Sequence, residues 1–228
     1  MSLRLDFWDF LIVLPGKVIR VGLQKKLYKA VLSPFPDLIW RAPASTNKIY
    51  LTFDDGPCPP VTQVVLEILT QYTIPALFFL TGIRIQEYQL ELKKLSYDPH
   101  RLGNHGFYHD PVIFKNGTRL SAEISETDLL IQKYFHKNTI YFRPPYGIWG
   151  PQLTRLMRIN SKRLVLWTLP ANDFRWPANR VYHQLIKRVE PGDIIVFHDS
   201  QRAAHTVLEV LPRFIEYCLQ HNLEFGLL

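Results

Sequence analysis

From about residue 45 onward, short apolar runs alternate with longer segments whose apolar residues recur at helical spacing, and this alternation constrains the fold more than any other feature. The apolar runs predict buried strands at residues 49–53, 76–81, 100–104, 139–142, 163–168, 193–197 and 224–228. The segments between them predict helices at residues 61–71, 86–95, 121–135, 152–159, 178–189 and 206–220. Such alternation joins parallel strands by right-handed crossovers, so the chain predicts an α/β fold, either an open doubly wound sheet or a barrel.

The length of the chain is that of one domain. Its 228 residues, 47% of them hydrophobic, can bury a single substantial core. Pro34, Pro36 and Pro43 separate an N-terminal segment from the alternating region. We therefore predict an N-terminal extension over residues 1–44 and one folded domain over residues 45–228.

The N-terminal extension combines apolar and basic residues. Residues 17–32 predict an amphipathic helix, which either docks on the domain or, less commonly, lets residues 1–32 lie on a membrane surface. The apolar run at residues 7–14 is too short to span a bilayer, and the basic residues follow it, whereas in a secretory signal they come first. These features favour a cytoplasmic or membrane-peripheral protein.

The charge and the cysteines exclude some classes of protein. The net charge of +7 is dispersed, and neither a long basic run nor zinc-finger spacing accompanies it, so no nucleic-acid partner is expected. Cys58 and Cys218 lie far apart in the sequence, which fits two free thiols better than a disulfide framework.

Polar residues that can do chemistry follow the predicted strands where each strand ends. In parallel α/β folds these ends converge on one face, where ligands and catalytic groups collect. The residues at these positions are Asp54, Asp55, His105, His109, Arg143, Asp173 and His198.

A metal site can be assembled from this set. His105 and His109 are four residues apart, so one helical turn would place both imidazoles on one side. Two histidines with a carboxylate form a His2Asp site with open positions for water. One of the adjacent carboxylates, Asp54 and Asp55, can bind the metal while the other faces a substrate, although a simple helix-capping turn explains them about as well.

Two further residues fit a hydrolytic site. His198 ends a very apolar strand, where histidine is usually a core residue, but imidazole titrates in the range needed to protonate a leaving amine. Arg143 can form a bidentate pair with a carboxylate and keep it ionised, or it can pair structurally with Asp173. The double-proline turn after Arg143 can direct backbone N–H groups at a developing oxyanion.

With these residues assembled, the sequence over residues 45–228 resembles the polysaccharide deacetylase family with the NodB homology domain, also called carbohydrate esterase family 4. Five motifs match in order, and as an ordered set they are highly specific. They are TFDDGP at residues 52–57, the His105–His109 pair, RPPY at residues 143–146, the acidic-aromatic pair Asp173–Phe174, and aliphatic-x-His at residues 196–198.

The resemblance implies a distorted (β/α)7 barrel that removes acetyl groups from an N-acetylated sugar or polysaccharide. It implies one divalent metal ion held by Asp55, His105 and His109, with zinc expected and cobalt, nickel or manganese as alternatives. By the same analogy, Asp54 is the general base and His198 the general acid. Arg143 orients Asp54, and Asp173 orients His198. Tyr146 and Val196 line the acetyl-methyl pocket, the Tyr146 backbone helps hold the oxyanion, and Phe174 contacts the sugar.

The chain departs from the family pattern at four positions, which predicts altered substrate contacts with activity retained. Gly106 and Tyr108 replace small hydroxyl residues, Pro170 replaces a frequent acidic residue, and Phe174 replaces a typical tryptophan.

Two other functions compete with the deacetylase. The first is a catalytically inactive sugar-binding module of the same fold, which we would expect to have lost Asp54 or His198. The second is an iron(II) oxygenase with a two-histidine, one-carboxylate triad; its folds are typically antiparallel, unlike the fold predicted for this chain.

Overall fold

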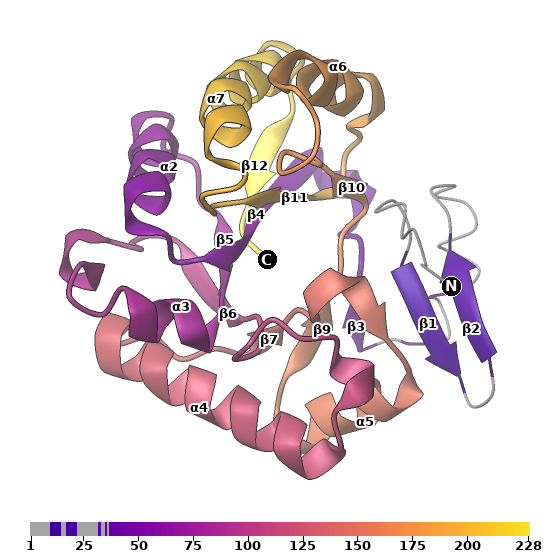
Figure 1. The fold of residues 1–228 in the computed structure, drawn as a ribbon. Helices are drawn as coiled ribbons and strands as arrows, with labels where there is room; N and C mark the ends of the chain where they lie inside the picture. Colours follow the sequence, from indigo (N-terminus) through magenta and orange to yellow (C-terminus); the bar gives the residue numbers. More distant parts are fainter. Residues whose placement is uncertain (1–9, 15–16, 22–31, 33–34, 36) are drawn as a thin grey trace.

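The structure is a computed structural model, and it describes residues 10–14, 17–21, 32, 35 and 37–228. Its main sheet curls around a central axis (Figure 1), and all its strand pairings are parallel. The strand order is β10-β11-β4-β5-β6-β7-β9-β3, with β12 also paired to β4. These strands are β3 (Leu38–Ile39), β4 (Lys48–Gly56), β5 (Leu77–Leu80), β6 (Arg101–Asn104), β7 (Tyr141–Phe142), β9 (Arg163–Val165), β10 (Leu169–Pro170), β11 (Ile194–His198) and β12 (Glu224–Gly226).

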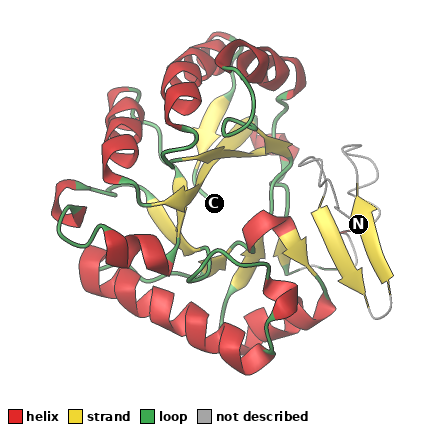
Figure 2. Ribbon diagram, viewed as in Figure 1, coloured by secondary structure: helices red, strands yellow, loops and turns green. Residues whose placement is uncertain are grey.

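Helices cover the outside of this curled sheet (Figure 2). They are α2 (Pro59–Gln71), α3 (Gly82–Glu87), α4 (Gly117–Phe135), α5 (Pro151–Ile159), α6 (Ala178–Arg188) and α7 (Ala204–Gln220). Short 3-10 helices occur at Ala44–Thr46, Leu92–Lys94, Val112–Phe114 and Pro145–Gly147. The helices bury their apolar faces against the strands, where Phe53 stacks with Phe78 and Phe197 in the core. The predicted α/β class and distorted barrel are confirmed. The barrel is open because β10 and β3 are the two ends of the described strand order.

Two of the elements predicted within residues 45–228 differ from the structure. The strand predicted at 163–168 is shorter in the structure, because β9 ends at Val165. A separate strand, β10, follows at Leu169–Pro170 and pairs with β11, whereas β9 pairs with β3 and β7. The helix predicted at 86–95 is wrong, because α3 begins directly after β5. The N–H groups of Gly82 and Ile83 at its start donate to the carbonyls of Gly106 and Phe107, which satisfies donors that a helix start leaves unpaired.

The described part of the N-terminal extension contains two paired strands. Strand β1 (Phe10–Leu14) pairs antiparallel with β2 (Lys17–Val21) and parallel with β8 (Ile148–Trp149). The helix predicted at 17–32 is therefore wrong over residues 17–21, where the β-branched sequence KVIRV favours the strand and pairing with β1 completes its hydrogen bonds. Residues 22–31 of that prediction lie outside the described residues. Within the described part of the chain, no helix has both the length and the apolar character needed to cross a bilayer.

Candidate active site

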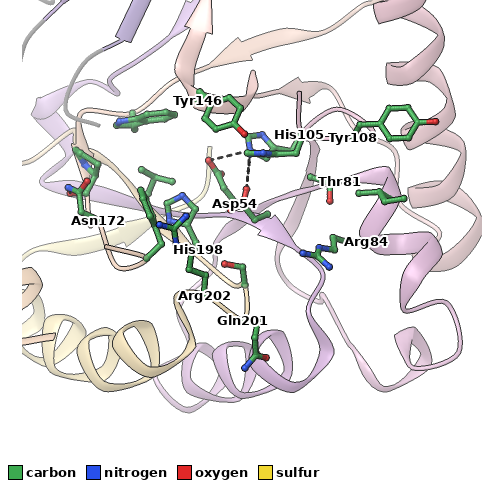
Figure 3. Close-up of a pocket in the computed structure, with 18 of the residues that line it drawn as sticks. Asp54, Thr81, Arg84, His105, Tyr108, Tyr146, Asn172, His198, Gln201 and Arg202 are labelled. Carbon is green, nitrogen blue, oxygen red and sulfur yellow. Dashed lines mark hydrogen bonds and ion pairs between the residues drawn. The ribbon is translucent and has the colours of Figure 1, made fainter. Parts of the chain in front are cut away.

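The carboxyl ends of the strands surround a cavity of about 840 Å³ (Figure 3). Residues from β4, β10 and β11 contribute to its wall, and so do residues shortly after the ends of β5, β6 and β9. Of the sequence-predicted site residues, Asp54, Asp55, His105, His109, Tyr146, Phe174, Val196 and His198 line this cavity. Arg143 and Asp173 lie behind it, almost completely buried. The structure therefore brings the whole predicted set to one end of the barrel.

A β-bulge places two adjacent carboxylates in the same cavity. Successive side chains of a regular strand point to opposite faces. In β4 the pairing with β5 shifts between Asp54 and Gly56, so Asp55 is an extra residue, and its φ is 73°. Because a bulge breaks the alternation of side chains, both Asp54 and Asp55 line the cavity.

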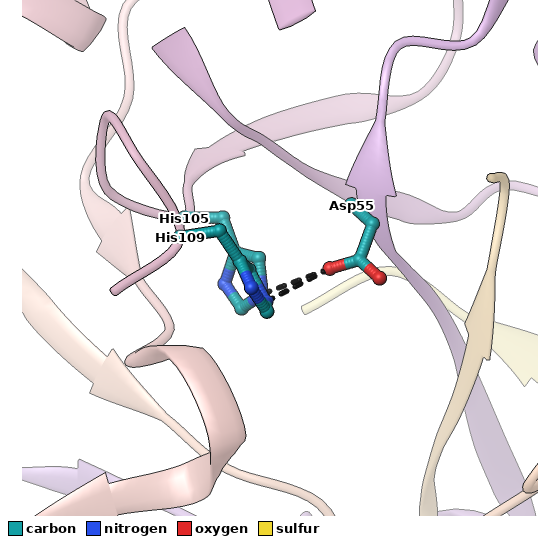
Figure 4. Close-up of side chains that lie close together, drawn as sticks. All are labelled: Asp55, His105 and His109. Carbon is teal, nitrogen blue, oxygen red and sulfur yellow. Dashed lines mark ion pairs between the residues drawn. The ribbon is translucent and has the colours of Figure 1, made fainter. Parts of the chain in front are cut away.

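Asp55, His105 and His109 form a cluster suited to a metal ion (Figure 4), in which one ligand atom from each residue lies within 4.8 Å of the others. Oδ1 of Asp55 is 3.5 Å from Nε2 of His105 and 3.0 Å from Nε2 of His109. Burial raises the pKa of Asp55, but the two imidazoles beside its carboxylate outweigh burial and hold that pKa well below its usual range. The cluster thus offers an ionised carboxylate beside two imidazoles.

The hydrogen bond at the far side of His105 fits a metal ligand. Nδ1 of His105 lies 2.8 Å from the backbone carbonyl of Arg143. A carbonyl only accepts, so Nδ1 carries the proton and Nε2 presents its lone pair to the cluster in the neutral ring. The donor set of two imidazoles and one carboxylate is one that zinc and related divalent metals use.

The histidine pair does not lie on a helical turn, contrary to the expectation from its spacing. His105 directly follows β6, and a non-helical loop reaches His109, where φ is 59°. Gly106, with φ of 79°, starts this loop, and its carbonyl is bound to the first N–H of α3. The ring centres of the two histidines are 5.0 Å apart, so the loop achieves the convergence that a helix would give.

Asp54 is paired with Arg143 at the base of the cavity. Nη1 of Arg143 donates to Oδ1 of Asp54 at 2.7 Å and to Oγ1 of Thr52 at 2.8 Å. Nη2 of Arg143 donates to the carbonyl of Leu166 at 3.0 Å, and the guanidinium lies 4.2 Å from the ring centre of Phe79. Burial lowers the pKa of Arg143, which the carboxylate of Asp54 opposes. This arrangement holds Asp54 as an oriented carboxylate, and Arg143 pairs with it and not with Asp173.

His198 is held by Asp173 on the other side of the cavity. Nδ1 of His198 lies 2.8 Å from Oδ1 of Asp173. Burial lowers the pKa of His198, but the charge of Asp173 and this hydrogen bond outweigh it, and the pKa rises to about 9. Phe174 packs edge-on against the imidazole, with ring centres 4.8 Å apart. A protonated imidazole is therefore available at neutral pH.

Several residues with strained backbone line the cavity. Of the nine described non-glycine residues with positive φ, four line it: Asp55, His109, Tyr146 and Asn172. Such conformations persist only where the surroundings enforce them, and they are common at functional sites. Tyr146, at 63°, carries its ring to an edge-on contact with His109.

Sequence reasoning missed several residues of the site. The buried hydroxyl of Thr52 connects Arg143 to the carbonyl of Ile195. Trp167 and Arg202 line the cavity. The sequence does carry a signal for Trp167: it lies near the end of a predicted parallel strand, where an aromatic side chain can face a ligand.

The sequence matches those of polysaccharide deacetylases. Residues 41–161 match the sequence model of the family described as polysaccharide deacetylase. The chain is 32% identical to a chitooligosaccharide deacetylase of Azorhizobium caulinodans, over 70% of this chain and 77% of that protein. It is 28% identical to a peptidoglycan-N-acetylglucosamine deacetylase of Bacillus cereus, over 83% of this chain and 90% of the relative. The chain therefore belongs to the polysaccharide deacetylase family.

Solved structures share the fold. A crystal structure of a peptidoglycan N-acetylglucosamine deacetylase superposes with a TM-score of 0.81 at 21% identity, covering 86% of this chain and 93% of the other. A carbohydrate esterase family 4 pseudoenzyme from Bacillus anthracis superposes with a TM-score of 0.77 at 19% identity, covering 84% of this chain and 67% of the other. At these identities the likeness concerns the fold, which active and inactive proteins share.

Proposed function

We propose that this protein is a metal-dependent hydrolase that removes acetyl groups from the nitrogen of an N-acetylated sugar or polysaccharide. The observation that carries the proposal is one cavity in which the Asp55–His105–His109 cluster lies beside two buried, oriented ion pairs. The family relatives, which are chitooligosaccharide and peptidoglycan deacetylases, support the class of substrate.

The proposed metal ligands are Asp55, His105 and His109, with zinc as the expected ion and cobalt, nickel or manganese as alternatives. Such an ion, when bound, supplies Lewis-acid activation of an acetyl carbonyl and of a water molecule. Asp55 contributes the negative charge of the site. The Arg143 carbonyl fixes the ring orientation of His105 through Nδ1.

Asp54 is the proposed general base. Its Oδ1 is occupied by Arg143, whereas Oδ2 lies 3.9 Å from Nε2 of His105, on the side of the proposed metal ligands. That free oxygen takes the proton from the attacking water. The pairing with Arg143 keeps the carboxylate oriented in a buried position, where an unpaired charge would be costly.

His198 is the proposed general acid. The departing sugar nitrogen needs a proton, and the Asp173 pairing keeps the imidazole protonated at neutral pH. The bond from Nδ1 to Asp173 also fixes the orientation of the ring. Asp54 and His198 are register partners on the adjacent strands β4 and β11, which places base and acid side by side.

The remaining predicted residues are proposed to bind the substrate. Val196 and Tyr146 form the pocket for the acetyl methyl group, and the backbone N–H of Tyr146 stabilises the developing oxyanion. Phe174 offers an aromatic surface to a sugar ring.

An acetate-release assay tests the function directly. N-acetylglucosamine oligomers are incubated with metal-free protein and with protein loaded with zinc. Acetate release that requires the metal is expected. Oligomer binding with a bound metal and no acetate release would instead support the alternative, an inactive sugar-binding module, which the fold of the pseudoenzyme relative illustrates.

A further inference from the structure

Arg202 is part of the cavity wall but has no role in the proposed reaction. Its guanidinium carbon lies 5.3 Å from the ring centre of Phe174. The same ring contacts the imidazole of His198. In Figure 3, Arg202 lies on the same side of the cavity as His198, and Arg84 lies on the opposite side. Phe174 therefore connects the proposed general acid to an exposed cation.

The charges that line the cavity are otherwise balanced by close partners. Asp54 pairs with Arg143, and Asp55 contacts both histidines of the cluster. Across the cavity, Glu87 pairs with Arg84.

His198 is neutralised by Asp173 in the same way. Within the described part of the chain, no carboxylate lies within ion-pair distance of Arg202, so its charge is uncompensated at the edge of the cavity.

We infer that Arg202 recognises a carboxylate on the substrate, on a sugar unit near the N-acetyl group that is hydrolysed. This inference rests on the proposed function. The guanidinium carbon lies over the ring of Phe174, and its N–H groups, which meet no carboxylate in the described part of the chain, can make a bidentate contact with a planar carboxylate. A singly charged carboxylate also balances the single charge of Arg202. The preferred substrate is then an N-acetylated glycan that carries acidic substituents, and Arg202 is a specificity-determining residue.

The test compares two oligomers that differ in one charge. One contains alternating N-acetylglucosamine and N-acetylmuramic acid, whose lactyl group is a carboxylate; in the other this carboxylate is converted to a primary amide. For the metal-loaded wild type we expect kcat/KM to be roughly tenfold higher on the carboxylate oligomer, as for one charge-assisted contact. Arg202→Gln should lose this preference and act on the two oligomers with similar kcat/KM.

Arg180→Gln is the matched control, because the guanidinium of Arg180 lies 4.0 Å from the ring centre of Trp176 but does not line the cavity. It should keep the full preference. The inference is overturned if the wild type does not distinguish the two oligomers, or if Arg202→Gln slows both equally.

If the wild type releases acetate from neither oligomer, the proposed deacetylase function fails, and this result does not decide whether Arg202 recognises a carboxylate. Calorimetric titration of the same oligomers then decides the inference about Arg202. A carboxylate preference in affinity that Arg202→Gln removes supports it, and equal affinities overturn it.

Discussion

Asp173 binds His198 through both of its carboxylate oxygens: Oδ1 accepts from the ring Nδ1 at 2.8 Å, and Oδ2 accepts from the backbone N–H at 2.7 Å. The two bonds fix the ring and its main chain together. Because the carboxylate is completely buried, its charge acts on the imidazole with little screening. The position and the pKa of the proposed acid therefore depend on one residue.

Replacing Asp173 with Asn should change the pH dependence of acetate release. The charge of Asp173 outweighs burial and raises the pKa of His198 to about 9, so the protonated acid persists above neutral pH. Without that charge the alkaline limb of kcat/KM should move to lower pH by roughly 1–3 units. Rate profiles of metal-loaded wild type and variant measure the shift. An unchanged alkaline limb would show that His198 is not the group that titrates there.

A methyl group at Gly56 should destabilise the turn that carries the adjacent carboxylates. A Cβ at this position would lie 2.4 Å from Oδ2 of Asp199, a buried side chain held by Thr62. Gly56→Ala should cost about 1–3 kcal/mol of unfolding free energy, as overpacking does. The control is Gly117→Ala, whose Cβ meets its nearest atom at 3.8 Å, and denaturant titration should find it close to wild type. Equal stability of both variants would contradict the predicted clash.

His100 should make stability fall in acid. Burial lowers the pKa of His100 to about 4, and its Nδ1 accepts a hydrogen bond from the N–H of Ala76 at 3.1 Å. The pKa of His100 is lower in the folded protein than in the unfolded chain, where it is near 6.5. The contribution of the neutral ring to folding stability is therefore complete above about pH 6.5 and is lost as the pH falls toward 4.

At pH 4 the loss due to His100 should be about 3 kcal/mol. His100→Asn keeps an acceptor for the Ala76 N–H without a titrating ring, so its stability should depend less on pH than that of the wild type. Thermal and denaturant unfolding at pH 7 and pH 4 measures the difference. Parallel pH profiles for the two proteins would argue against a buried neutral His100.

The order of strands and helices could be predicted because the pattern of apolar residues along a sequence reports which residues are buried. Strands β4, β5, β6 and β11 are mostly buried, and their apolar runs indicate them. The pairing of β1 with β2 in the N-terminal extension could not be predicted. Residues 17–21 fit a helical pattern and a strand pattern alike, and only the pairing with β1 decides between them. The start of α3 depends on carbonyls of the loop after β6, which are distant in sequence.

The site residues could be predicted from strand ends and motifs, but their geometry could not. The bulge at Asp55 and the positive φ of His109 follow from contacts with other strands and loops. Arg202 matches no motif and belongs to no predicted strand end. Its guanidinium lies over the ring of Phe174, a contact that only the folded chain reveals.

The adjacent carboxylates have different proposed tasks, with Asp55 holding the metal and Asp54 moving a proton. The most direct measurement determines bound zinc per chain and acetate release together for the wild type, Asp54→Asn and Asp55→Asn. Asp55→Asn should bind zinc far more weakly, since it loses the charged ligand of the cluster. Asp54→Asn should retain zinc while acetate release falls by roughly 10²–10⁴-fold, the contribution of a general base. Full acetate release by Asp54→Asn, or full zinc retention by Asp55→Asn, would contradict this division of roles.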